Sequence, residues 1–176
     1  MSSDKGEVIS GFPPVVVTGA EVLILGSMPG QASLDAEQYY AHPRNAFWSI
    51  ICQLFNAPQK LGYPERLALL RENRIALWDV MQHCVREGSL DSSIEQASIV
   101  ANDFAGFFDD HPSIRYLFFN GAQAEASFKR HVIPILSRHS FVIEMQRLPS
   151  TSPAHASMSL EQKLAQWQRV RDVLVR

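Results

Sequence analysis

Four short apolar runs limit what this chain can fold into more than any other feature of the sequence. They cover residues 21–26, 75–78, 116–119 and 141–145, and the first reads Glu-Val-Leu-Ile-Leu-Gly. Continuous apolar runs of this length, bounded by turn residues, are typical of strands buried on both faces. We therefore predict four strands in one covered sheet.

Segments with helical spacing of apolar residues lie between these runs. We predict helices over residues 45–55, 65–73, 102–108, 122–131 and 159–174. Asn102 is the expected N-cap of the third, and a capping box from Ser159 to Gln162 opens the last. A short helical turn is predicted over 34–40 and a polar loop over 79–93. Strands that alternate with helices predict an α/β fold with a mostly parallel sheet covered on both faces.

The length of 176 residues suits a single domain, which we place at 19–176 behind an irregular N-terminal arm over residues 1–18. The first ten residues are polar and lack the pattern of a signal peptide, and no apolar run is long enough to span a membrane. We expect a soluble, cytoplasmic protein. The two cysteines, Cys52 and Cys84, are too few for a disulfide framework or a metal site of their own.

In a parallel sheet of this kind, ligands bind beyond the carboxyl ends of the strands. Four predicted loops meet there, at residues 27–45, 79–93, 120–123 and 148–157. The first begins Gly26-Ser-Met-Pro-Gly30, which has neither the spacing of a dinucleotide-binding loop nor the Lys-Ser/Thr of a phosphate-binding loop. A structural turn and a ligand site both fit this motif.

The segment 38–48 is dense in aromatic residues and also contains His42, Arg44 and Asn45. Aromatic rings that stack on bases, interleaved with arginine for phosphates, favour recognition of a single base or a single strand. The alternative is that Asn45 caps a helix and His42 lies on the surface.

Three further patterns in the sequence bear on the site. The loop 147–155 combines two prolines with small hydroxyl side chains, which suits a rigid phosphate contact or a plain linker. Asp79 and Asp91 are candidate carboxylates, although each could cap a turn instead. No Ser-His-Asp triad fits the spacing, and His83 next to Cys84 is a weak indication of a thiol nucleophile.

Several segments, taken together and in order, resemble the uracil-DNA glycosylase superfamily. They are Ile24–Gly30, Gln38–Trp48, Ala76–Val80 with Gly88–Asp91, Phe118–Gly121 and Leu148–Ala154. Within that superfamily, the chain is most similar to the branch of hypoxanthine-DNA (deoxyinosine) glycosylases. The resemblance covers residues 24–155, and its most specific part is the segment 38–48.

The resemblance implies a three-layer α/β/α sandwich around a central four-stranded sheet. It also implies a monofunctional DNA glycosylase of base excision repair, acting as a monomer on double-stranded DNA that contains a deaminated base. Such an enzyme flips the base out of the duplex and hydrolyses its bond to deoxyribose. Negative charge develops on the departing base, so the site must stabilise that base and position one water.

The resemblance also implies roles for individual residues. Asn45 would position or activate the water, and either His155 or backbone groups would hold the leaving base. The base would be bound by Gly26, Ser27, Met28, Pro29, Phe47 (by stacking), Asp79 and Asn120. The DNA backbone would be bound by Arg44, Pro149, Ser150, Thr151 and Ser152, with the loop from Pro149 to His155 clamping phosphates and filling the vacated space.

Three positions depart from the pattern of many superfamily members. Met28 stands where an Asp or Asn activates water, Leu148 stands where a His or Asn holds the base, and the four cysteines of an iron–sulfur cluster are missing. We therefore expect no metal or cofactor. The apolar replacements favour hypoxanthine as the substrate, because a purine leaves more easily once N7 is protonated or hydrogen-bonded.

Other functions stay open at this point. The chain could be specific for uracil or for G:T/U mismatches, or it could bind damaged DNA without excising a base. A nucleotide-processing enzyme with His155 or His42 as the base is a further alternative. The net charge of −2 argues against a strongly basic DNA binder, but Arg44, Arg86 and Arg147 fall in or beside the predicted loops and predict a small positive rim.

Overall fold

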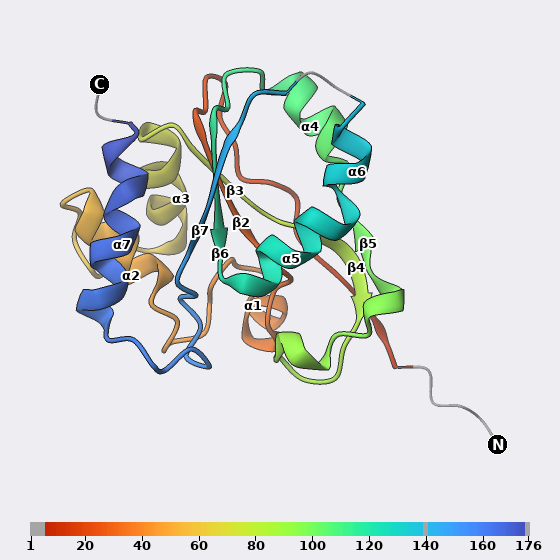
Figure 1. Ribbon diagram of the computed structural model, residues 1–176. Coiled ribbons are helices and arrows are strands. Elements are labelled where there is room, and N and C mark those ends of the chain that lie inside the picture. The colour runs from red at the N-terminus through yellow and green to blue at the C-terminus, as the bar shows by residue number, and fades with distance from the viewer. Residues whose placement is uncertain (1–5, 139–140, 175–176) are drawn as a thin grey trace.

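The structure is a computed structural model that describes residues 6–138 and 141–174. Its centre is a four-stranded parallel sheet with the strand order β3-β2-β6-β7 (Figure 1). The strands are β2 (Val22–Gly26), β3 (Ile75–Asp79), β6 (Tyr116–Asn120) and β7 (Glu144–Leu148). The chain leaves β2 toward β3 on one side and later returns to β6 on the other, so a crevice opens beyond the end of β2.

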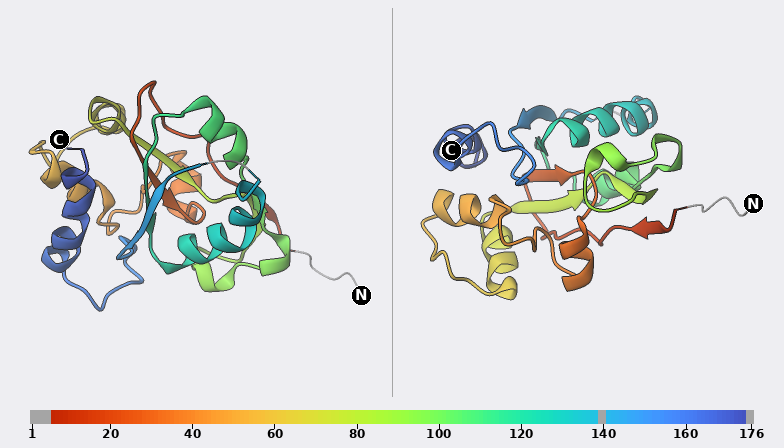
Figure 2. Two further views of the ribbon diagram at one scale, coloured as in Figure 1. Left: turned by 45° about the horizontal axis from the view of Figure 1, so that its top comes forward. Right: turned by 90° about the horizontal axis from the view of Figure 1, so that it is seen from below.

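Helices cover both faces of this sheet, as predicted (Figures 1 and 2). One layer holds α2 (Phe47–Leu54), α3 (Tyr63–Glu72) and α7 (Leu160–Asp172), and the other holds α4 (Phe104–Asp110), α5 (Ala122–His131) and α6 (Ile133–Leu136). Alternate residues of β2 point to opposite layers: Val22 and Ile24 pack in one core cluster, and Leu23 and Leu25 in the other. The prediction of an α/β/α sandwich is therefore confirmed.

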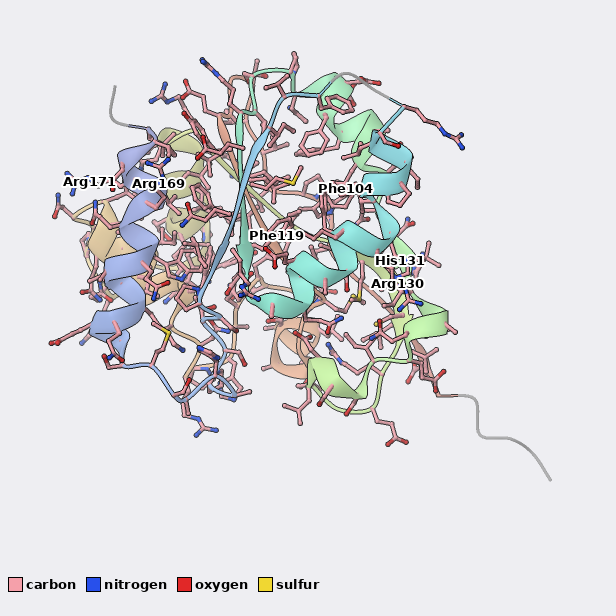
Figure 3. All side chains as sticks on the ribbon, in the orientation of Figure 1. Phe104, Phe119, Arg130, His131, Arg169 and Arg171 are labelled. Atoms are coloured by element: carbon pink, nitrogen blue, oxygen red, sulfur yellow. The ribbon has the colours of Figure 1, made fainter. Side chains whose placement is uncertain are left out.

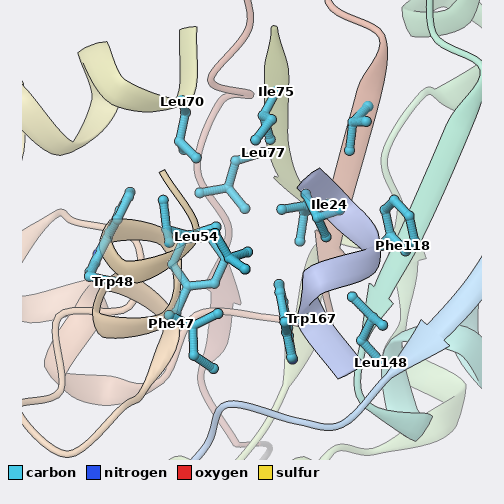
Figure 4. Close-up of a cluster of buried hydrophobic side chains, with 14 of the residues drawn as sticks. Ile24, Phe47, Trp48, Leu54, Leu70, Ile75, Leu77, Phe118, Leu148 and Trp167 are labelled. Carbon is cyan, nitrogen blue, oxygen red and sulfur yellow. The ribbon is translucent and has the colours of Figure 1, made fainter. Parts of the chain in front are cut away.

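The first core cluster joins the sheet to α2, α3 and α7 (Figure 4). Phe47 and Trp167 are both fully buried in it, and their rings meet edge to face at 5.9 Å. The second cluster lies on the opposite face, where Phe128 of α5 contacts both Phe104 and Phe119, which are labelled in Figure 3. Two aromatic cores thus clamp the sheet and fix the positions of its strand ends.

The helix boundaries lie close to the predicted ones except at α1 and at the N-cap of α4, and the short helix α6 was not predicted. The capping box of Ser159 and Gln162 opens α7 as expected. The predicted turn at 34–40 is a helix that begins earlier, α1 (Gln31–Ala36). The N-cap of α4 is Asp103, which accepts a hydrogen bond from the Gly106 N–H, whereas Asn102 donates to the Asp79 carbonyl oxygen. Asn102 therefore fastens the end of β3 instead of capping a helix.

A second, small sheet was not predicted. Its order is β1-β4-β5, formed by β1 (Val8–Ser10), β4 (Met81–Val85) and β5 (Val100–Ala101) in antiparallel pairs. The first strand lies within the segment predicted to be an irregular arm, and β4 lies within the predicted polar loop 79–93. Short 3-10 turns η1 (Asp91–Ser93) and η2 (Gln96–Ser98) complete that loop. Both predictions were wrong because these strands are held by pairing between distant segments.

The last strand was placed three residues too early. The apolar run 141–145 precedes β7, which spans Glu144–Leu148 and has four exposed residues before the buried Leu148. An edge strand with exposed side chains on both faces lacks the continuous apolar run that marks a buried strand. No helix in the described ranges is long and apolar enough to cross a membrane.

Candidate active site

A cavity of about 680 Å³ opens at the carboxyl ends of β2, β3 and β6, in the crevice that the strand order creates. Segments from all four predicted loops line it. Twelve of the fourteen predicted site residues are among them: Gly26, Ser27, Met28, Pro29, Arg44, Asn45, Asp79, Asn120, Ser150, Thr151, Ser152 and His155. The structure thus gathers residues that lie far apart in the sequence around one space.

Phe47 is the first exception. It is fully buried and belongs to the first core cluster, so it does not offer a free ring to a ligand. Tyr40 lies between Phe47 and the cavity, with the two rings stacked at 4.1 Å and tilted by 24°. Tyr40 therefore lines the cavity with Phe47 packed behind it, and Tyr39 lines the cavity as well. The aromatic density of the segment 38–48 signalled such a residue but did not identify it.

Pro149 is the second exception. Its carbonyl oxygen accepts a hydrogen bond of 2.9 Å from the Trp167 indole N–H, which ties the start of the loop to the buried face of α7. Pro149 is absent from the described lining of the cavity. Its position fixes where the loop begins, and the residues after it reach the cavity.

Asn45 lines the cavity and does not cap α2, whose N-cap is Ala46. The Asn45 Oδ1 accepts a hydrogen bond of 3.0 Å from the Phe47 backbone N–H at the start of α2, while the residue also lines the cavity. The N–H donor settles which end of the amide is oxygen. One lone pair of Oδ1 and both hydrogens of Nδ2 remain for a ligand or a water.

Asn120 and Thr151 form a reciprocal pair between β6 and the 149–155 loop. The Asn120 Nδ2 donates to the Thr151 Oγ1, and the Thr151 backbone N–H donates to the Asn120 Oδ1, each at 2.9 Å. Gly121 follows with φ of 97°, and a Cβ there would come within 3.0 Å of the Ser150 Cβ. The loop is thereby pressed against the strand end.

His155 closes the cavity on the loop side. Its backbone N–H donates to the Ser152 carbonyl oxygen at 3.0 Å, which folds the loop into a turn. The Nε2 of its ring is buried, and no residue in the described ranges hydrogen-bonds to it. A buried ring nitrogen of this kind is available to a ligand that enters the cavity.

Asp79 lies at the cavity floor and is 4% exposed. Its Oδ2 is buried with no hydrogen-bond partner in the described part of the chain, and the same holds for the Tyr40 hydroxyl. A Cβ on Gly26 would collide with the Asp79 Oδ1 and the Tyr40 hydroxyl, so glycine is needed for this close approach. Two polar groups thus converge on the cavity floor.

Burial raises the pKa of Asp79 to about 7; the negative charge of Asp91 adds to this and the positive charge of Arg86 opposes it. Burial also raises the pKa of Asp91, against a lowering effect of its hydrogen bond from Ser27. The pKa of Tyr40 lies above its ordinary range because of burial and then of Asp79. The Asp79 carboxyl can therefore carry a proton near neutral pH.

Arg86 does not lie on a positive rim, as was predicted, but in the protein interior. It is buried, and its guanidinium donates from Nη2 to the Pro29 carbonyl oxygen at 2.6 Å and from Nε to the Gly88 carbonyl oxygen at 2.8 Å. Arg147 is an ion-pair partner of Glu125 at 3.7 Å. Arg44 is exposed and lines the cavity, so the positive rim is smaller than predicted. Within the described ranges, no three His, Cys, Asp or Glu residues are placed to bind one metal ion.

Fold and site together define an α/β protein with a cavity at the switch point of a parallel sheet, the place where such folds bind ligands. The sequence profile of the uracil DNA glycosylase superfamily matches residues 13–173. The chain belongs to this superfamily.

Two relatives and one solved structure are similar to this chain. A hypoxanthine DNA glycosylase of Methanosarcina acetivorans is 37% identical over 161 residues, which cover 91% of this chain and 96% of that protein. A hypoxanthine DNA glycosylase of Methanosarcina barkeri is 40% identical over 115 residues, which cover 65% and 72%. A solution NMR structure of a Methanosarcina acetivorans protein, provisionally assigned as a uracil DNA glycosylase, aligns with a TM-score of 0.79 and 35% identity over 97% of this chain and all of that one.

Proposed function

We propose that this protein excises hypoxanthine from DNA by hydrolysing the bond between the base and deoxyribose. The observation that carries the proposal is the meeting of Asn45, Asp79 and His155 around one cavity. The names of the two curated relatives support hypoxanthine as the base. The monofunctional reaction uses water and leaves an abasic site.

The cavity suits a base that has left the duplex. A base inside the stack is inaccessible to these residues, so the nucleotide rotates outward at a cost of about a few kcal/mol. Tyr40, with Phe47 behind it, offers an aromatic wall for the extruded base. Gly26 keeps this space open, because a side chain there would meet Asp79 and Tyr40.

Asn45 positions the attacking water. The Phe47 N–H holds the amide in one orientation, and the free lone pair of Oδ1 accepts a hydrogen bond from that water. An amide is too weak to remove a proton early, so the bond to the base must be largely broken before the water attacks. Such a dissociative reaction depends chiefly on stabilising the leaving base.

In this proposal, two groups stabilise the leaving base. They are the carboxyl of Asp79 in its protonated form and the Nε2 of His155. A neutral carboxylic acid is a hydrogen-bond donor, and a donor aimed at a purine oxygen or nitrogen becomes stronger as negative charge develops there. The buried Nε2 of His155, as a donor, adds a second contact. Asn120 lines the same cavity, where its amide holds the loop in place through Thr151.

The 149–155 loop and Arg44 contact the DNA backbone. The hydroxyl oxygens of Ser150 and Ser152 each accept a hydrogen bond from a backbone N–H two residues onward, at 3.2 Å. Their own O–H hydrogens are therefore free to donate to phosphate oxygens. We propose that the protein acts as a monomer on double-stranded DNA. That the chain is cytoplasmic stays a prediction.

Uracil is the alternative base. Met28 lines the cavity but cannot activate water, and Leu148 is 1% exposed and packs in the first core cluster. Because neither side chain can activate water or hold the base, hypoxanthine, the base that leaves more easily, is favoured over uracil. Parallel assays on duplexes with one deoxyinosine or one deoxyuridine should give faster excision of hypoxanthine.

The decisive test is the Asn45→Ala variant in a single-turnover assay on a duplex with one deoxyinosine, read by alkaline cleavage of the abasic product. We expect a loss of about 10²–10³-fold in rate, the range found for removal of one aligned polar group at a reacting centre. The Asn45→Asp variant keeps an oxygen for the Phe47 N–H and for the water, and should retain most activity. Thermal melting of each variant checks the fold.

Full activity of the folded Asn45→Ala variant would contradict the proposed mechanism. Binding of the deoxyinosine duplex by the wild-type protein without any abasic product would instead identify a damage-binding protein that lacks excision. Activity on free nucleosides in the absence of DNA would indicate a nucleotide-processing enzyme.

A further inference from the structure

Tyr40 has a backbone conformation that is unusual for a residue with a large side chain. Its φ is 53°, in the left-handed region, where the side chain crowds the backbone. Three other non-glycine residues in the described ranges share this conformation, but they do not line the cavity: Glu37, Asn56 and Arg74. A strained residue in a cavity wall indicates that its side chain is held in place for a function.

The peptide groups on both sides of Tyr40 are fixed by side chains from two helices. The carbonyl oxygen of Tyr39 accepts a hydrogen bond of 2.8 Å from the indole N–H of Trp48, a buried residue of α2 that is labelled in Figure 4. The N–H of Ala41 donates to the hydroxyl oxygen of Ser33, a buried residue of α1, at 3.1 Å. These two bonds hold the backbone of Tyr40 in its strained conformation and so determine where its side chain points.

The side chain of Tyr40 reaches the cavity floor beside Asp79. Its ring packs on Phe47 with the ring centroids 4.1 Å apart, and a Cβ on Gly26 would collide with both the Tyr40 hydroxyl and the Asp79 Oδ1. The two side chains therefore flank the same point. In the part of the chain that the structure describes, no residue accepts a hydrogen bond from the Tyr40 hydroxyl or forms one with the Asp79 Oδ2, and both atoms are buried. Such a place favours a ligand atom that bonds to both groups.

The Tyr40 hydroxyl is a donor toward the cavity. Burial and the charge of Asp79 raise the pKa of Tyr40 above its ordinary range, so the hydroxyl keeps its proton. The Asn120 side chain lowers that pKa, as an amide N–H does when it faces a phenol oxygen, and the Asn120 Oδ1 is occupied by the Thr151 N–H. Asn120 thus presents its donor to the Tyr40 oxygen and leaves the hydroxyl hydrogen for a ligand.

We propose that Tyr40 is a specificity-determining residue, whose hydroxyl donates a hydrogen bond, together with the Asp79 carboxyl, to the exocyclic oxygen of the base. Two donors suit a carbonyl oxygen, which has two lone pairs. Deamination of adenine replaces a donating amino group with such an oxygen, so this pair separates hypoxanthine from adenine, which would leave the buried donors unpaired. An offset base can contact the ring of Tyr40 and its hydroxyl edge together. This inference rests on the proposed function and deepens it.

The test compares Tyr40→Phe with wild type on duplexes that carry deoxyinosine or deoxynebularine opposite thymine, below the pKa of Asp79. The base of deoxynebularine is a purine without the 6-oxygen, and the variant keeps the ring and loses only the hydroxyl. We expect the single-turnover rate to fall about 10-fold on deoxyinosine, the effect of one hydrogen bond, and to change less than about twofold on deoxynebularine. Tyr39→Phe is the matched control. The Tyr39 hydroxyl already donates to the Pro13 carbonyl oxygen at 2.8 Å, so its loss should leave the ratio of the two rates unchanged.

An equal fall of Tyr40→Phe on both duplexes would indicate a structural role and overturn the proposal, and so would equal rates of this variant and wild type on deoxyinosine. If wild type excises no hypoxanthine, the proposed function fails separately. Where an excision rate cannot be measured, the inference is decided by binding to duplexes with hypoxanthine or adenine on a 2′-fluoroarabino sugar, which resists hydrolysis. Wild type should bind the hypoxanthine duplex about 10-fold more tightly and Tyr40→Phe should narrow this preference, whereas an unchanged preference would refute the inference.

Discussion

The two walls of the cavity satisfy their polar groups in opposite ways. The acidic wall consists of Asp79 and Asp91, which both line the cavity, and the buried Asp79 Oδ2 has no hydrogen-bond partner in the described chain. The amide wall consists of Asn120 and Thr151, which bond to each other at 2.9 Å in both directions. One wall leaves polar atoms available, whereas the other uses them to hold the loop in place.

This difference separates a chemical role from a structural one. A buried polar atom without a partner destabilises the folded protein, and such atoms are retained where a ligand supplies the missing partner. A mutually bonded neutral pair stabilises the fold and leaves little for a ligand. We therefore expect changes in the acidic wall to alter excision most, and changes in the amide wall to alter stability most.

The largest expected effect is on excision by Asp79 variants. Asp79→Ala removes the donor to the leaving base and should lower the excision rate about 10²–10³-fold. Because protonated Asp79 is the active form and its pKa lies at about 7, wild-type activity should fall as the pH rises above 7. Asp79→Asn keeps a neutral donor and should remove this dependence.

The pH dependence has its own controls. His155→Gln should keep the fall in activity above pH 7, which would assign it to Asp79 and not to the imidazole. Exposed Asp110 serves as the matched control, since Asp110→Asn should leave the profile unchanged. Activity that rises with pH in the wild type would show that ionised Asp79 is the active form and would reverse the proposed role.

The next largest effect is a fall in the stability of the folded protein as the pH rises. Folding raises the pKa of Asp79 from its ordinary value of about 3.9 to about 7, so the folded state binds more protons between these values. Stability therefore falls as the pH rises through this interval. Asp79→Asn should be more stable than wild type at pH 8, by about 1 kcal/mol or more, which corresponds to ~2–4 °C in Tm. A lower Tm for Asp79→Asn than for wild type at pH 8 would contradict the conclusion that burial of the ionised Asp79 carboxylate destabilises the fold.

The amide wall should respond differently. Thr151→Val keeps the shape of this 1% exposed side chain but leaves the Asn120 Nδ2 without its acceptor. We expect a loss of about 1–3 kcal/mol in the free energy of unfolding, measured by denaturant titration, with a smaller fall in excision than for Asp79→Ala. Exposed Thr18 provides the matched control, Thr18→Val. A larger loss of excision than in Asp79→Ala would break the proposed division between the walls.

The smallest effect concerns salt. Arg86 is buried and Arg147 is ion-paired, so Arg44 is the main arginine left at the rim. The logarithm of DNA affinity against the logarithm of salt concentration should have a shallow slope, equivalent to about one to three phosphates. Arg44→Ala should reduce this slope by the equivalent of about one phosphate, whereas Arg138→Ala, at an exposed position, should leave the slope unchanged. A steep slope in the wild type would indicate basic contacts that lie elsewhere.

The sequence was sufficient to locate the buried parts of the fold. Strands β2, β3 and β6 are continuous apolar runs, and both faces of each are covered, so local pattern and tertiary position agree. The edge strand β7 was shifted by three residues because only Leu148 in it is buried. Strands β1 and β4 were missed because their pairing joins segments more than seventy residues apart, as the register of Ser10 with His83 shows.

The site was predicted less completely, for a physical reason. Motifs located the loops at the strand ends, and twelve residues of those loops do line the cavity. The burial of Phe47 behind Tyr40 depends on how α2 packs against α7, which no local pattern encodes. The burial of Arg86 likewise depends on two carbonyl oxygens from separate turns. The chemical identity of a side chain is local information, whereas its exposure depends on the whole fold.

The exposed face of β7 has a consequence for how copies of this protein meet. As an edge strand, β7 has unfilled backbone positions that could pair with another chain. Glu144 on this strand is bound to Arg169 of α7, and Arg147 is bound to Glu125 of α5. These paired charges, from both helical layers, lie beside the open edge and oppose strand addition by a second copy. We therefore expect the strand that ends at the cavity also to limit aggregation at high concentration.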